Sequence, residues 1–185
     1  MISKKIILLI TSIYQILNIT SIKANDKTYT RIVSLNSLGA DIVSKLNNKA
    51  LVGIPGSTLL KKDKNFENKV VISSGRMPPS IEKIIELKPD LVIGSKGFHD
   101  KVLNKLNELN IKTLKTETKS IQNLENLIEK LSNNLKKDKN ILLNEIKDCY
   151  KIPLKTKGSA VVLASTKPLL SPNSQSWAGS LLDQF

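Results

Sequence analysis

The sequence predicts an α/β protein built around a parallel sheet, and two observations lead to this prediction. Short runs rich in Ile, Val and Leu alternate along the chain with longer stretches whose apolar residues recur at helical spacing. The short runs are apolar almost throughout, which is typical of strands that helices cover on both faces. Alternating strands and helices of this kind form stacked βαβ units.

The predicted strands are six short runs: residues 31–35, 50–54, 70–73, 90–94, 111–114 and 160–164. The predicted helices between them are four groups of apolar residues, each on one helix face: Leu38, Ile42, Val43 and Leu46; Ile81, Ile84 and Ile85; Val102, Leu103, Leu106 and Leu109; and Ile121, Leu124, Leu127, Ile128, Leu131 and Leu135. Ser80 and Ser120 are the predicted N-caps of the second and fourth helices, and Pro89 marks the end of the second.

These elements divide the chain into three parts. We predict a Rossmann-like parallel-sheet lobe over residues 31–135, a connecting helix over 138–152 and the start of a second α/β lobe over 159–185. An independent domain needs at least ~50 residues, so the third part predicts a second lobe that lacks most of itself.

Residues 1–24 have the pattern of a secretory signal peptide. Lys4 and Lys5 precede the apolar run 6–10, and the small residue Ala24 precedes a polar stretch. We therefore expect export and removal of residues 1–24. An uncleaved membrane anchor is the alternative, although the apolar run is short for a membrane span.

The composition argues against several classes of function. The net charge is +13, but only Arg31 and Arg76 are arginines, the residue that phosphate clamps and base readers favour. We expect no nucleic-acid partner. One Cys and one His exclude a disulfide framework and any site of several Cys or His ligands. His99 follows a predicted strand, and a solvated loop histidine is the preferred interpretation over a ligand contact.

No catalytic or phosphate-binding motif is present in the sequence. The glycine-rich phosphate loops are absent, and a nucleophile–histidine pair would have to use His99. The sequence therefore predicts neither an enzyme nor a protein with a cofactor of its own.

One segment carries a specific resemblance to a known family. Residues 76–94, Arg-Met-Pro-Pro-Ser-Ile-Glu-Lys-Ile-Ile-Glu-Leu-Lys-Pro-Asp-Leu-Val-Ile-Gly, resemble the central signature of the periplasmic substrate-binding proteins that serve ABC importers of vitamin B12, ferric siderophores and haem. Residues 31–36 and 51–54 are similar to the first two strands of that family, and 160–182 to the opening of its second lobe. The resemblance implies a periplasmic monomer that binds its ligand between two lobes and delivers it to an inner-membrane permease.

The loops after the predicted strands supply the candidate site, because ligands of open parallel sheets bind beyond the carboxyl ends of the strands. Together with the resemblance, they give these candidate ligand-binding residues: Asn36, Ser37, Pro55, Gly56, Arg76, Met77, Lys96, Phe98 and Trp177. Phe98 and Trp177 offer apolar faces, while Arg76 and Lys96 offer positive charge. These chemistries suit a ferric siderophore, haem or cobalamin, whose metal would enter only as part of the chelate.

The resemblance also assigns a role to Glu82, as an exposed acid that docks against arginines of the permease. An ordinary solvated glutamate in the first turn of a helix is the alternative. Two other functions stay open for the whole chain: a truncated, binding-incompetent remnant of such a protein, and a basic module that associates with anionic lipid or polymer.

Overall fold

The structure is a computed structural model that describes residues 28–74, 77–150 and 161–182. The predicted signal peptide, Arg76 and residues 151–160 lie outside the described residues. The predicted division into lobes at these boundaries stays a prediction.

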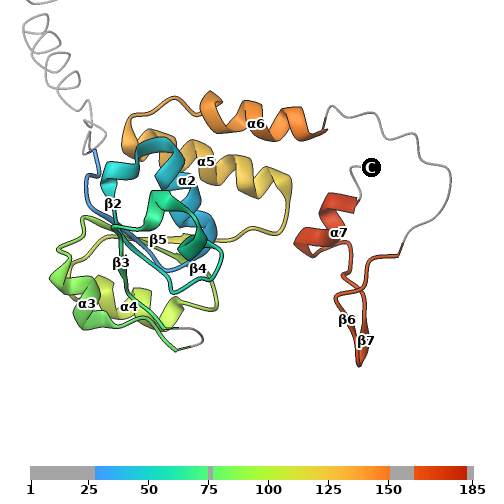
Figure 1. The fold of residues 1–185 in the computed structure, drawn as a ribbon, viewed down its shortest axis with the longest axis horizontal. Helices are drawn as coiled ribbons and strands as arrows, with labels where there is room; N and C mark the ends of the chain where they lie inside the picture. The colour runs from blue at the N-terminus through green and yellow to red at the C-terminus, as the bar shows by residue number, and fades with distance from the viewer. Residues whose placement is uncertain (1–27, 75–76, 151–160, 183–185) are drawn as a thin grey trace, which may run out of the picture.

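A parallel five-stranded sheet, in the order β3-β2-β1-β4-β5, forms the centre of the fold (Figure 1). Its strands are β1 Ile32–Ser34, β2 Leu51–Ile54, β3 Val70–Val71, β4 Leu91–Ser95 and β5 Thr113–Thr116. The chain runs outward from β1 to β3 and then returns to place β4 on the other side of β1. The strand order therefore reverses between β1 and β4, and a crevice opens at such a switch point beyond the carboxyl ends of the strands.

Helices cover both faces of this sheet (Figure 1). One face carries α2 Ser37–Asn47, α5 Ile121–Leu135 and α6 Asn140–Tyr150, and the other carries α3 Ile81–Glu86 and α4 Asp100–Glu108. Short 3-10 turns lie at η1 Asn48–Ala50, η2 Leu60–Lys62 and η3 Lys64–Phe66. None of the helices that the structure describes is long and apolar enough to cross a lipid bilayer.

The core forms two apolar layers because successive strand residues point to opposite faces. Ile32 and Ile93 pack with residues of α2 and α5, whereas Val33 and Val92 pack with residues of α3 and α4. All four side chains are fully buried. The α/β class and the doubly covered parallel sheet predicted from the sequence are confirmed.

Local hydrogen bonds explain where two of the helices begin. Ser80 Oγ accepts the backbone N–H of Lys83 at 3.2 Å, and Ser120 Oγ accepts that of Asn123 at 3.2 Å. Each hydroxyl satisfies a backbone donor that the first turn of a helix leaves unpaired. Both predicted N-caps are confirmed.

The predicted strand at 160–164 is wrong over its described part. Residues 161–164 are not a strand, and β6 Ser165–Thr166 instead pairs antiparallel with β7 Leu169–Leu170. Along 161–163 the structure shows no neighbouring strand among the described residues, whereas the Lys167-Pro168 turn brings β6 and β7 together. Helix α7, Trp177–Leu182, follows this hairpin.

Candidate ligand-binding site

A cavity of about 360 Å³ lies at the carboxyl edge of the sheet, among the loops that follow β1, β2, β3 and β4. We call it the edge cavity, and its lining residues are Leu35, Asn36, Ser37, Pro55, Gly56, Ser57, Ser73, Met77, Pro79, Ser95, Phe98 and His99. Six of the residues chosen from the sequence are among them: Asn36, Ser37, Pro55, Gly56, Met77 and Phe98. The structure thus brings most of the candidate residues around one cavity.

Two other candidates line separate cavities. Lys96 lines a neighbouring cavity of about 390 Å³, which shares Asn36 and Ser95 with the edge cavity. Trp177, on α7, lines a third cavity of about 290 Å³ together with Leu38, Thr118 and Leu124. Arg76 is outside the described residues.

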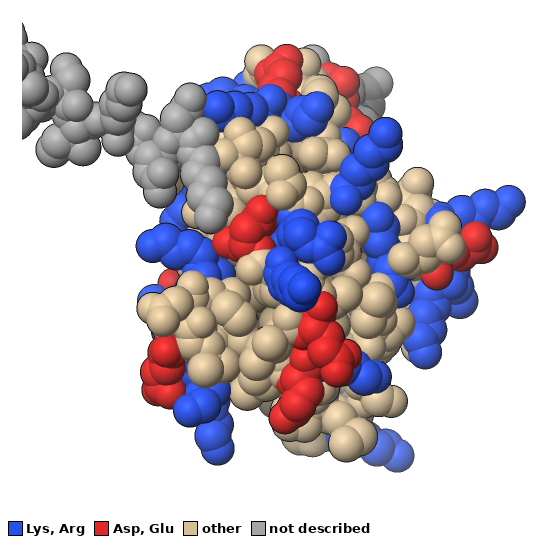
Figure 2. All heavy atoms as spheres, turned by 90° about the vertical axis from the view of Figure 1, so that its left-hand side faces the viewer, with Lys and Arg blue, Asp and Glu red and all other residues tan. Residues whose placement is uncertain are grey.

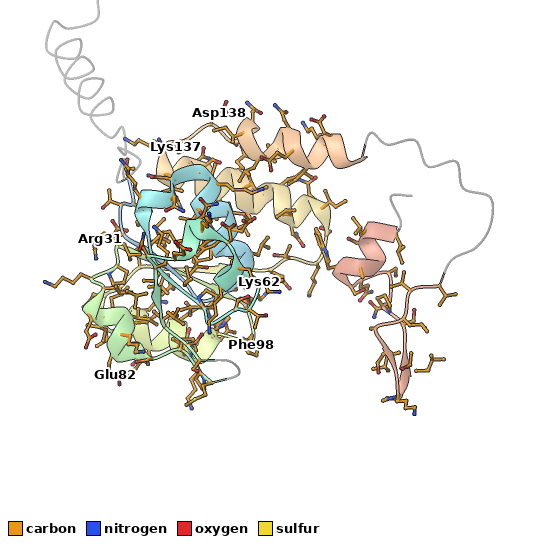
Figure 3. All side chains as sticks on the ribbon, in the orientation of Figure 1. Arg31, Lys62, Glu82, Phe98, Lys137 and Asp138 are labelled. Carbon is orange, nitrogen blue, oxygen red and sulfur yellow. The ribbon has the colours of Figure 1, made fainter. Side chains whose placement is uncertain are left out.

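The rim of the edge cavity is apolar and exposed. Phe98 is 84% exposed and Met77 is 68% exposed, and neither belongs to a helix or a strand. The Phe98 ring meets the His99 ring edge-on, with centroids 4.8 Å apart and planes at 83°. In Figure 3, Phe98 lies on the side of the sheet opposite Arg31, which precedes β1. The exposed side chains of Phe98 and Met77 therefore offer apolar surface to a ligand and are not part of the buried core.

Asn36 connects the ends of β4 and β5 to the start of α2 beside the edge cavity. Its Oδ1 accepts the backbone N–H of Gly39 at 2.7 Å, so Asn36 is the N-cap of α2. Its Nδ2 donates to Ser95 Oγ at 3.0 Å and to Thr116 Oγ1 at 3.1 Å. Because both amide hydrogens are engaged, Asn36 positions the strand ends, and the hydroxyl of Ser95 keeps its own hydrogen for a further acceptor.

His99 differs from the sequence-based interpretation. It is only 6% exposed, so the prediction of a solvated loop histidine is wrong. The turn after β4 folds back on itself, and His99 Nδ1 accepts the backbone N–H of Ser95 at 3.0 Å. Gly94 permits this approach, since a Cβ there would lie 3.0 Å from the Cβ of His99. Burial lowers the pKa of His99, which favours the neutral ring.

Several residues of the edge cavity are not among the candidate ligand-binding residues: Leu35, Ser57, Ser73, Pro79, Ser95 and His99, for which a ligand contact is the less favoured interpretation of the sequence. Most of them belong to the same loops after strands that drew attention to their neighbours. The signal that could have found His99 is its place between the end of a strand and the start of a helix, at the carboxyl edge of the sheet where ligands bind.

Lys96 is engaged with protein groups. Its Nζ lies 3.0 Å from Glu117 Oε2, and Lys119 Nζ lies 2.7 Å from Glu117 Oε1. Hydrogen bonds from Lys119 and Lys96 lower the pKa of Glu117, which keeps this carboxylate ionised. The predicted positive charge of Lys96 is therefore partly compensated at the site.

Glu82 lies in the first turn of α3 and is exposed. Its own backbone N–H, and then the hydroxyl of Ser80 at 2.9 Å, lower the pKa of this carboxyl group. Figure 3 shows Glu82 well separated from Phe98, so the two residues lie on different parts of the surface.

The charged surface is mixed on the face that Figure 2 shows, where acidic side chains interrupt the lysines. The guanidinium group of Arg31 is hydrogen-bonded within the protein, because its Nη2 donates to the backbone carbonyl of Leu87 at 2.7 Å. Over the described parts of the chain, no three side chains of His, Cys, Asp or Glu come together in a group that could hold a metal ion.

Comparison with solved structures finds the same fold in bacterial binding proteins. An ABC transporter substrate-binding protein of Listeria monocytogenes is 22% identical, with a TM-score of 0.64 over 84% of this chain and 62% of its own. A protein of Staphylococcus epidermidis, described as a possible iron-binding (periplasmic solute-binding) protein, is 22% identical, with a TM-score of 0.69 over 85% of this chain and 66% of its own. The periplasmic vitamin B12 binding protein BtuF of Vibrio cholerae is 22% identical, with a TM-score of 0.61 over 84% of this chain and 64% of its own.

This chain therefore spans less than two thirds of the length of each of these three proteins. A search of curated proteins found no match. The family model for periplasmic binding proteins, however, matches residues 32–139, which include the whole five-stranded sheet and helices α2 to α5. On this match, which covers more than half of the sequence, the chain belongs to the periplasmic binding protein family.

Proposed function

We propose that this chain is the solute-binding component of an ABC importer and that it captures a metal chelate at the carboxyl edge of its sheet. The observation that carries the proposal is the edge cavity at the switch point between β1 and β4, in a chain of this family. Ligands of open parallel sheets occupy this crevice. Structural relatives that are named for vitamin B12 and for iron support a chelate as the ligand.

The chemistry of the cavity supports the same proposal. Its volume of about 360 Å³ falls in the usual range for small-molecule sites. Ser37, Ser57 and Ser95 are among its lining residues, and so are the exposed side chains of Phe98 and Met77. A large chelate with apolar faces and peripheral oxygen atoms finds complementary groups here. Trp177 is the candidate to contact the same ligand from α7.

Delivery and location complete the proposal. The chain acts in the periplasm after export, carries no cofactor of its own and passes its ligand to an inner-membrane permease. Glu82 is the proposed docking residue, because it is an exposed, ionised carboxylate on α3, away from the rim residue Phe98. Rim charges of this kind act mainly on the rate of encounter and on partner choice.

Binding is tested with the purified chain and four probes: haemin, cyanocobalamin, ferrioxamine B and ferric enterobactin. Trp177 is the only tryptophan, so its fluorescence reports ligand binding, and calorimetry provides an independent measure. We expect saturable binding of at least one probe, and Phe98→Ala should raise its Kd by about tenfold.

Leu109→Ala is the matched control, because Leu109 is also a large exposed apolar side chain but lies at the end of α4, away from the edge cavity. The control should bind as the parent chain does. The proposal is contradicted if none of the four probes binds, or if Leu109→Ala and Phe98→Ala weaken binding equally. Salt-dependent binding to anionic vesicles without chelate binding would instead indicate a surface-association module.

A further inference from the structure

His99, the only histidine of the chain, holds its ring in one defined protonation pattern. The backbone N–H of Ser95 donates to Nδ1 at 3.0 Å. A backbone N–H can only donate, so Nδ1 must present its lone pair. The proton of the neutral ring therefore resides on Nε2.

The Nε2–H group has no protein acceptor within the described parts of the chain. Since Nε2 makes no hydrogen bond there and is not among the fully buried side-chain atoms that lack one, it keeps some exposure to solvent. His99 is one of the residues that line the edge cavity, and it is only 6% exposed. An unpaired donor in such a place favours a ligand that brings an acceptor.

The charged groups around His99 are engaged with other partners. Asp100, the next residue, pairs with Lys115 of β5 at 3.2 Å, and Lys96 pairs with Glu117 at 3.0 Å. Phe98 packs edge-on against the imidazole. Neither Asp100 nor Glu117 accepts a hydrogen bond from Nε2, so this donor is available to a ligand.

We infer that His99 donates a hydrogen bond from Nε2 to an oxygen atom of the bound chelate. This inference rests on the proposed function and names its ligand class. With Nδ1 occupied and Nε2 protonated, the ring has no free lone pair for a metal ion. The inference favours ferric siderophores, whose hydroxamate or catecholate oxygens enclose the metal. It disfavours a haem whose iron is bound by an axial histidine.

The protonation pattern is measured directly by NMR of the chain labelled with ¹⁵N in its single histidine. Without ligand, we expect Nε2 to carry the proton and Nδ1 to be unprotonated. Gallium(III) complexes of desferrioxamine B and of enterobactin serve as diamagnetic probes. Binding should shift the Nε2–H resonance while both nitrogens keep their protonation. A proton on Nδ1, or loss of the Nε2 proton to a metal ion, would overturn the inference.

Two variants separate the donor role from a structural one. His99→Asn places an amide oxygen where Nδ1 lies, so it keeps an acceptor for the Ser95 N–H but has no donor that reaches the Nε2 position. His99→Gln places an amide N–H near the Nε2 position but fits the Ser95 N–H poorly. We expect His99→Asn to raise the Kd for the gallium complexes by about tenfold. His99→Gln should bind within about threefold of the parent chain, although it unfolds more easily.

The outcomes distinguish the two proposals. If neither gallium complex nor any of the four probes binds the parent chain, the proposed function fails, and this inference fails with it. If a gallium complex binds the parent and the His99→Asn variant equally, or binds without shifting the Nε2–H resonance, only the inference fails.

Discussion

The side-chain amide of Asn36 donates to Ser95 Oγ at 3.0 Å and thereby joins the end of β1 to the end of β4. Its second amide hydrogen reaches Thr116 Oγ1 of β5 at 3.1 Å. Three neighbouring strands are therefore fixed to one another at the edge where the cavity lies. The same residue caps α2, so the position of that helix is coupled to the strand ends.

We predict that Asn36→Ala lowers the free energy of unfolding by about 2 kcal/mol, because it removes the helix cap and both strand contacts. Asn36→Asp should lose less, since its carboxylate still accepts from Gly39 and can accept from the hydroxyl of Ser95, whereas the hydroxyl of Thr116 already donates to the carbonyl of Gly94. Urea unfolding measures the differences. Asn104→Ala, which removes an exposed amide from α4, is the control and should change stability little. Equal losses for Asn36→Ala and Asn104→Ala would disprove the structural role of Asn36.

Ser132 offers a stabilising change. Its side chain is fully buried in α5, and Oγ has no hydrogen-bond partner among the described residues. Ser132→Ala removes an unsatisfied hydroxyl and improves helix propensity, so we expect the free energy of unfolding to rise by about 1 kcal/mol.

The exposed neighbour supplies the control for this change. Asn133→Ala gains helix propensity alone, worth ~0.5 kcal/mol, without altering a buried polar group. Thermal or urea unfolding compares the two variants. A gain at Ser132 no larger than the gain at Asn133 would show that the buried hydroxyl has no cost.

The stability of the chain should depend on pH through His99. Burial lowers the pKa of His99 in the folded protein below its ordinary value of 6.5, so the unfolded chain takes up a proton at higher pH than the folded one. The free energy of unfolding is therefore fully retained above about pH 7 and falls as the pH drops through the unfolded pKa towards the lowered folded pKa. Two charged residues close to His99 in the sequence are already paired, Asp100 with Lys115 and Lys96 with Glu117.

Urea unfolding between about pH 8 and about pH 5, in the parent chain and in His99→Asn, tests this dependence. We expect the variant to show a smaller decrease below pH 7, because it lacks the titrating ring. An identical pH dependence in both chains would assign the effect to other groups.

Glu82 and Glu86 provide a matched pair for the docking proposal. Both are exposed carboxylates on α3, so substitution of either by arginine makes the same change in charge. We expect Glu82→Arg to leave chelate affinity unchanged and to lower uptake of labelled chelate by about fivefold at low ionic strength. Glu86→Arg should have a smaller effect on uptake. Equal uptake by the Glu82 variant and the parent chain would remove the docking role from Glu82.

The carboxylate of Glu117 offsets the positive charge of Lys96 and Lys119 beside the edge cavity. Glu117→Gln should release their charge towards the cavity, and we expect about threefold tighter binding of the anionic ferric enterobactin with no change for neutral cyanocobalamin. The comparison requires that both probes bind, and Glu108→Gln, which frees Lys105 at the other end of α4, is the control. Tighter binding of both probes by Glu117→Gln would contradict an electrostatic cause.

Much of the fold was predictable because its determinants are local in the sequence. Apolar runs without alternation predicted β1, β2 and β4, and Ser80 and Ser120 predicted helix starts that the structure confirms. The segment at 161–164 was not predictable in the same way, because an apolar run becomes a strand only beside a partner. The turn at Lys167-Pro168 favours a local hairpin between residues 165–166 and 169–170 instead.

The candidate site was predictable as a set of loops, but the tasks of its residues were not. Position after a strand indicated Asn36, Met77 and Phe98, which the structure places around one cavity. The burial of His99 depends on how the turn after β4 folds back onto Ser95. The orientation of Lys96 depends on Glu117, which is 21 residues away in the sequence. Contacts of both kinds require the three-dimensional arrangement.

The exposure of Met77 and Phe98 has a consequence for how such a protein can change over generations. Substitutions at exposed loop positions usually alter the free energy of unfolding by less than about 0.5 kcal/mol. Mutations of Met77 and Phe98 at the rim should therefore be tolerated by the fold. Asn36 and His99, in contrast, are linked by hydrogen bonds to Ser95 at the end of β4, so changes there affect the stability of the fold. Substitutions should therefore accumulate at the rim sooner than at Asn36 and His99.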